Sequence, residues 1–158
     1  MAVSATTRRI RRGEVDGVSY HFLTPQEFEA RVAAGEFLEH VTYAGNRYGT
    51  LRSEVDRILS AGLSPVVEIE LAGARAVRAM VPDAVSVFIA PPSRQELSAR
   101  LERRATDTEA EIAQRLRTSE IEFAARDEFD HVVVNEEVDS AVDDLARIVS
   151  VAIGAVDG

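Results

Sequence analysis

Four arginines gather within five positions near the start of the sequence, and two tyrosines follow in strand-like segments. These residues are Arg8, Arg9, Arg11, Arg12, Tyr20 and Tyr48. A guanidinium group presents two parallel N–H donors that match two oxygens of a phosphate group. Phenol hydroxyls can add neutral donors to the same oxygens. The stretch therefore predicts a site for a small phosphate dianion, although an arginine run alone also fits a solvated surface.

Two glutamates lie two positions apart in an apolar segment. Glu68 and Glu70 alternate with Val67, Ile69 and Leu71, so in a strand both carboxylates would face one side. Ligands of open parallel sheets gather at the carboxyl ends of the strands. A buried carboxylate is costly unless a cation or a donor meets it. The spacing therefore favours a binding role for this pair over a structural one.

A further arginine group lies on one face of a predicted helix. Arg100, Arg103 and Arg104 are spaced three and four apart. Such a cluster could surround a transferring phosphate, or it could be a charged solvent face that pairs with neighbouring glutamates. The three histidines of the chain show no metal-ligand spacing, so no metal site is predicted.

Composition bounds the class of protein. The 158 residues are 46% hydrophobic and 28% charged, with no cysteine, no lysine and a net charge of −9, which fits one globular domain at a cytoplasmic location with no membrane segment. Four arginines and no acid lie in the first twelve residues, so the remainder is strongly acidic and should repel long nucleic acid. A phosphate-cradling G-x-x-x-x-G-K-[ST] loop requires lysine, so the sequence contains none.

Two halves with different patterns follow each other. The first reads as a strand over 3–7, a hairpin turn at Asp16-Gly17, a helix over 25–34, a hairpin over 36–43 and 47–50, and a helix over 52–61. The second alternates strands and helices: strands over 65–71, 85–90 and 131–134, and helices over 73–81, 93–103, 108–126 and from 138 to the end. Such alternation predicts a parallel sheet.

This arrangement resembles the guanylate kinase family over essentially all of the chain. The resemblance implies that Arg8, Arg11, Tyr20 and Tyr48 hold the phosphate of GMP. It also implies that Glu39 accepts the two adjacent donors of the guanine edge, which adenine lacks. The remaining expected contacts to the nucleoside are Ser4, Thr50, Glu68 and Glu70, and the expected catalytic residues are Glu70 with the lid arginines Arg104 and Arg115.

The resemblance also implies the fold. We expect a single α/β domain over 1–158, like the P-loop kinases, with a three-layer parallel sheet that lacks its first, central strand. A small mixed-β region that binds GMP would cover about 3–62, and the truncated core about 63–158, with a helical lid at about 100–126. The strands at 65–71 and 85–90 would then close up, or another segment, a partner or a second copy in a homo-oligomer would pair with them.

The expected function is ATP-dependent phosphorylation of GMP to GDP. Mg²⁺ would accompany ATP, and no tightly bound cofactor is expected. Without the lysine loop, turnover should be low, and Glu70 and Ala72 depart from the aspartate and glutamine usual in the family. The alternative is a catalytically impaired module that binds GMP or a phosphopeptide. A nucleic-acid binder that uses Arg8–Arg12 is the third possibility.

Overall fold

The computed structural model describes residues 1–158 apart from 44, 103–108 and 157–158. It contains two compact units, Met1–Ala84 (unit 1) and Val85–Gly158 (unit 2), each described by itself. The predicted boundary at about residue 62 falls inside unit 1 and stays a prediction. Among the described residues, no helix is long and apolar enough to cross a membrane.

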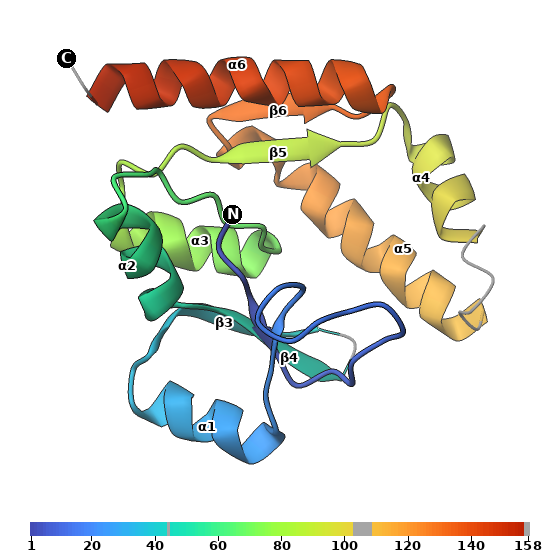
Figure 1. Cartoon of the computed structure of the whole chain (residues 1–158). Coiled ribbons are helices and arrows are strands. Elements are labelled where there is room, and N and C mark those ends of the chain that lie inside the picture. The colour runs from blue at the N-terminus through green and yellow to red at the C-terminus, as the bar shows by residue number, and fades with distance from the viewer. Residues whose placement is uncertain (44, 103–108, 157–158) are drawn as a thin grey trace. The chain divides into compact units, whose positions relative to one another are not determined.

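Unit 1 is built on a mixed four-stranded sheet in the order β2-β1-β4-β3. Its elements are β1 (Ala5–Thr6), β2 (His21–Phe22), α1 (Pro25–Ala33), β3 (Phe37–Tyr43), β4 (Asn46–Leu51), α2 (Arg52–Ser60) and α3 (Leu71–Met80). The predicted mixed-β region is thus confirmed as architecture. α1 and α3 lie on opposite sides of the β3–β4 hairpin in Figure 1.

Rings make the core between α1 and the sheet. The fully buried Phe28 of α1 stacks on Phe37 of β3 with ring centroids 4.4 Å apart, and Ala5 and Leu51 complete the cluster. His40 meets both rings edge-on. Burial of these apolar side chains stabilises the packing of α1 on the sheet.

An irregularity in β3 places the side chains of Phe37 and Glu39, two positions apart, on opposite faces of the sheet. Phe37 pairs with Leu51 and Glu39 with Thr50, so β3 uses two residues where β4 uses one. In a regular strand Phe37 and Glu39 would face the same side. The β-bulge at Leu38 instead leaves Phe37 and His40 against α1 and turns Glu39 toward α3.

Two sequence-based expectations about unit 1 are wrong. β1 and β2 pair in parallel, so the segment between them is a crossover loop and not an Asp-Gly hairpin. The segment 65–71 does not form a strand: residues 63–70 have no regular structure, and Leu71 already belongs to α3. The backbone hydrogen bond from Ala2 N–H to Val66 O, at 2.9 Å, does not make the ladder of such bonds that a strand needs.

Unit 2 contains a two-stranded parallel sheet of β5 (Val87–Ala90) and β6 (His131–Val134). Its helices are α4 (Arg94–Glu102), α5 (Glu109–Ala124), the short 3-10 helix η1 (Arg126–Glu128) and α6 (Val138–Val156), which packs along β6. Ser86 fixes the register, since its N–H and hydroxyl both donate to Asp130 Oδ2, at 2.8 and 2.6 Å. The expected parallel sheet is therefore confirmed here, but only for these two strands.

Candidate functional site

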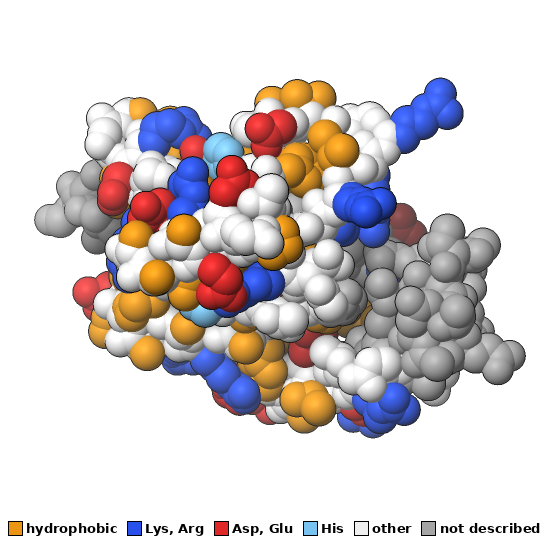
Figure 2. Space-filling view, turned by 90° about the horizontal axis from the view of Figure 1, so that it is seen from below, with side chains coloured by type: hydrophobic (Ala, Val, Ile, Leu, Met, Phe, Trp, Pro, Cys, Tyr) orange, Lys and Arg blue, Asp and Glu red, His pale blue; other side chains and the backbone are white. Residues whose placement is uncertain are grey.

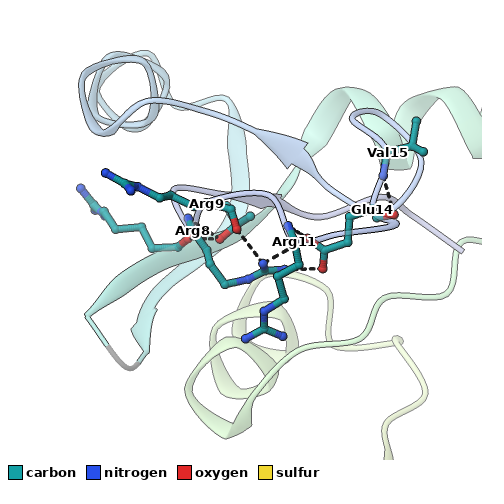
Figure 3. A network of polar contacts seen from close by, with 8 residues as sticks. Arg8, Arg9, Arg11, Glu14 and Val15 are labelled. Atoms are coloured by element: carbon teal, nitrogen blue, oxygen red, sulfur yellow. Dashed lines mark hydrogen bonds and ion pairs between the residues drawn. The ribbon is translucent and has the colours of Figure 1, made fainter. Parts of the chain in front are cut away.

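The arginine loop between β1 and β2 folds around a glutamate. Glu14 accepts from both terminal nitrogens of Arg8, at 3.1 and 2.7 Å, and from the Arg11 N–H at 2.7 Å. Figure 3 shows this carboxylate between the two arginines, with the Arg11 guanidinium pointing away from it. The hydrogen bond from Arg8 is the main cause that lowers the pKa of Glu14, and in return it raises the pKa of Arg8. The loop is thus held in shape while Arg8 stays charged.

Aromatic rings surround the same guanidinium. The Arg8 Cζ atom lies 5.3 Å from the ring centroid of Tyr20 and 5.8 Å from that of Phe22. Tyr20 and Tyr48 meet edge-on at 6.2 Å, and Tyr48 also interacts with Arg8. Three of the four predicted phosphate-binding residues therefore form one cluster, and Arg11 joins it through the Glu14 loop. Its neighbours Arg9 and Arg12 are exposed.

Glu39 is buried and held at one oxygen. Its residue exposure is 5%, and that of Thr50 is 1%. Thr50 donates to Glu39 Oε1 from both its N–H, at 2.9 Å, and its hydroxyl, at 2.8 Å. Burial raises the pKa of the Glu39 carboxyl, and these two hydrogen bonds only partly oppose that shift. A buried carboxylate with one anchored oxygen can accept donors from a ligand at the other.

Glu70 reaches the same place from another element. It is the N-cap residue of α3 and is half-buried. Burial raises the pKa of the Glu70 carboxyl, and the negative charge of Glu39 raises it further. The structure therefore brings Glu39, Thr50 and Glu70 together.

Of the two other predicted contacts, one is exposed, and the other directly precedes Ala5, which pairs with Gly49 beside Thr50. Glu68 is exposed, so the expectation of two buried carboxylates on one strand is wrong, because the segment is not a strand. Ser4 lies just before β1, where its carbonyl accepts from the His21 N–H at 2.9 Å.

Neither predicted lid arginine has a side chain within the described part of the chain. Arg104 lies outside the described residues, and Arg115 falls within α5 with its side chain outside the described part of the chain. Within the same helical region, Arg100 pairs with Glu96 at 3.0 Å and donates to the Asn135 carbonyl at 3.2 Å. That part of the predicted cluster has structural partners.

Sequence reasoning missed two residues at this site. One is Glu14, which orders the arginine loop; an acid six positions after Arg8 was a local signal for it. The other is Gly73 of α3, which lies against the Glu39 carboxylate. Glu39 and Gly73 are 34 residues apart in the sequence, and no local sequence pattern indicates their contact.

Comparisons with known proteins identify the family. The Guanylate kinase family model matches residues 1–152. The chain belongs to the guanylate kinase family. A guanylate kinase from Frankia casuarinae is 50% identical over 155 residues, covering 98% of this chain and 83% of that protein. One from Mycobacterium leprae is 46% identical over 159 residues, covering 99% of this chain and 74% of its own length.

A solved structure agrees with this assignment. The crystal structure of guanylate kinase from Anaplasma phagocytophilum superposes with a TM-score of 0.80 at 33% identity, covering 95% of this chain and 73% of that one. The resemblance seen in the sequence is confirmed, and with it membership in a family of ATP:GMP phosphotransferases. The fold neighbour also confirms the α/β kinase class at the level of the whole family.

Proposed function

We propose that unit 1 binds GMP and that the chain takes part in phosphoryl transfer from ATP to GMP. The observation that carries this proposal is the buried carboxylate of Glu39. Its Oε1 atom accepts two hydrogen bonds from Thr50, whereas its Oε2 atom accepts none from the residues that the structure describes. Guanine offers two adjacent donors, N1–H and the 2-amino group, to such an acceptor. Adenine presents an acceptor at N1 and would leave the carboxylate unsatisfied, which costs affinity.

The phosphate of GMP would lie in the cluster of Arg8, Arg11, Tyr20 and Tyr48. Arg8 already has its guanidinium fixed by Glu14, so little side-chain freedom is lost when an anion binds. Ser4, Glu68 and Glu70 are the further proposed contacts to the nucleoside. The relatives named guanylate kinases support GMP as the acceptor over other phosphomonoesters.

The donor side rests on the family. ATP is the proposed donor, with Mg²⁺ on its phosphates as part of the co-substrate, and no residue of this chain is assigned to hold the metal. Arg104 and Arg115 are proposed to stabilise the charge on the transferring phosphoryl group. Glu70 is proposed as the acidic catalytic residue, and it would also contact the acceptor nucleoside.

Two measurements test the proposal. Calorimetric titration with GMP, AMP and a phosphoserine peptide should give clear binding for GMP alone among the three at micromolar to submillimolar concentration. A coupled assay for ADP release, with ATP and GMP present, should give turnover that stops when GMP is replaced by AMP. Preference for the peptide would instead support a phosphopeptide-binding module, because the arginine–tyrosine cluster suits any phosphomonoester.

A further inference from the structure

The first turn of α3 packs against Glu39 at a residue that has no side chain. Gly73 is buried, and a Cβ atom built on it would lie 2.8 Å from Glu39 Oε2 and 3.2 Å from Glu39 Cδ. The Ile69 Cβ atom would lie 3.3 Å away on another side. Both carboxylate distances are shorter than van der Waals contact, so the Glu39 carboxylate occupies the space of a missing methyl group.

Contacts with Thr50 and with α3 restrict the position of the Glu39 carboxylate. The β-bulge at Leu38 turns Glu39 away from the aromatic core and toward α3. Thr50 anchors Oε1 through two hydrogen bonds, so the position of Oε2 depends on what stands opposite it. The residue opposite Oε2 is Gly73.

We infer that Gly73 is a positioning residue that sets guanine specificity by leaving room for Glu39 Oε2. The inference rests on the proposed function, in which Glu39 accepts the guanine donors. An added methyl group would push Oε2 toward the ligand side or rotate the carboxylate about its Thr50 contacts. Hydrogen bonds weaken steeply with such errors in distance and angle. Selectivity for guanine would fall while the phosphate cluster stays unchanged.

The same substitution should spare the fold. The atom closest to the added methyl group, at 2.8 Å, is the far end of the Glu39 side chain, whereas a clash with backbone could not be relieved so easily. The Ile69 Cβ atom, at 3.3 Å, has to shift by only a few tenths of an ångström. Alanine is also a better helix former than glycine, which favours α3. The effect of Gly73→Ala should therefore be seen in ligand choice and not in stability.

The experiment compares Gly73→Ala with a matched control, Gly154→Ala. Both exchange a helical glycine for alanine, but a Cβ atom at Gly154 would meet nothing within 4 Å. Affinities of the full chain for GMP and AMP are measured by NMR titration, which also reaches millimolar dissociation constants, and thermal unfolding is followed in parallel. We expect Gly73→Ala to lose at least tenfold in the ratio of GMP to AMP affinity, with AMP affinity and Tm nearly unchanged. Gly154→Ala should leave the ratio at the wild-type value.

The outcomes separate this inference from the proposed function. If wild-type protein prefers GMP and Gly73→Ala keeps that preference, the role of Gly73 is wrong and the proposed function stands. If Gly73→Ala weakens GMP and AMP equally or fails to fold, Gly73 is a structural residue and the inference is also overturned. If the wild-type protein binds both nucleotides alike, the proposed function fails and takes the inference with it.

Discussion

Arg8 and Glu39 carry opposite charges in opposite settings. Arg8 is kept ionised by a carboxylate in contact with it, and their mutual interaction moves both pKa values away from neutrality. Glu39 is buried, and burial raises the pKa of its carboxyl, although the two hydrogen bonds from Thr50 partly oppose that shift. A ligand with two adjacent donors at one end and a dianion at the other would donate hydrogen bonds to Glu39 and pair its dianion with Arg8.

Glu39→Gln tests whether the buried charge serves binding at the expense of stability. The amide keeps an acceptor for Thr50 but removes the buried negative charge. We expect Tm at pH 8 to rise by about 2–4 °C, which corresponds to about 1 kcal/mol in a chain of this size. GMP affinity should fall about ten- to hundredfold, because a hydrogen bond to a charged partner contributes about 1.5–3 kcal/mol. An unchanged GMP affinity would contradict the assigned role.

The raised pKa of Glu39 also predicts a pH dependence. Guanine needs the ionised carboxylate, so selectivity is present above that pKa and is lost as pH falls through it, at a higher pH than an ordinary glutamate would give. The folded state binds protons more readily than the unfolded state here, so stability falls as pH rises through the same range. The ratio of GMP to AMP affinity between pH 4 and pH 8 measures the first effect, since both ligands share the same titrating phosphate. A ratio that is flat in wild type, or that still varies in Glu39→Gln, would refute this origin.

Arg8→Lys should weaken the phosphate cluster without touching base selection. Lysine keeps the charge but loses the planar fork that meets two oxygens at once. We expect GMP and AMP affinities to fall together by about tenfold, about 1.4 kcal/mol. Arg12→Lys, at an exposed position of the same loop, is the control and should leave both affinities within twofold.

At the level of elements, helix ends follow from local sequence signals, whereas strand pairing depends on residues far apart in the chain. Thr24 forms the predicted capping box with Glu27, and α1 begins at Pro25 as expected. Helix ends elsewhere fall within about three residues of the predictions, because caps and glycine stops act over a few positions. Whether residues 65–71 form a strand depends on partners far away in sequence, and no pattern within the segment could supply them.

The site shows the same division. Glu39 and Thr50 face each other across a hairpin whose turn and alternation were readable, so their proximity was predictable. The bulge at Leu38, which decides the face that Glu39 occupies, leaves no clear mark in the sequence. The Gly73 contact depends on how α3 packs, so it required the structure.

Glu54 joins α2 to the N-terminal strand region, and its charge should matter for stability. It accepts from Arg57 at 2.9 Å and from the Val3 N–H at 3.3 Å, and it lies 3.4 Å from His21 Nε2. These partners, Arg57 first, lower the pKa of Glu54 to about 2. The stabilisation is therefore present above the ordinary glutamate pKa and is lost as pH falls from about 5 toward about 2.

Urea unfolding of Glu54→Gln measures this contribution. We expect a loss of about 1–2 kcal/mol at pH 7 that shrinks toward zero near pH 2. Glu36→Gln is the control, because the Arg31–Glu36 pair is exposed on both sides and should contribute under about 0.5 kcal/mol. Equal losses for the two variants would show that Glu54 is an ordinary surface acid.

At the scale of the whole molecule, the charged surface side chains and the edge of strand β5 are the features that a binding partner would meet. On the face in Figure 2, arginine and acidic side chains alternate with apolar groups, and neither sign forms a continuous surface. β5 has one neighbour, β6, in the described sheets, and Ile89 of β5 is 47% exposed.

Pairing of such an edge with a second copy stays a prediction. If it occurs, the mass measured by sedimentation should rise with protein concentration from monomer toward dimer, and Ile89→Arg should prevent the rise. A monomer mass at every concentration up to about 1 mM would rule it out.

The measurement that tests the central claim most directly is titration of the wild-type chain with GMP and with AMP under identical conditions at pH 7.5. The account predicts saturable one-to-one binding of GMP and at least tenfold weaker binding of AMP, with the Glu39 and Thr50 resonances shifting only for GMP. Equal affinity for the two nucleotides, or no binding of GMP at millimolar concentration, would contradict it.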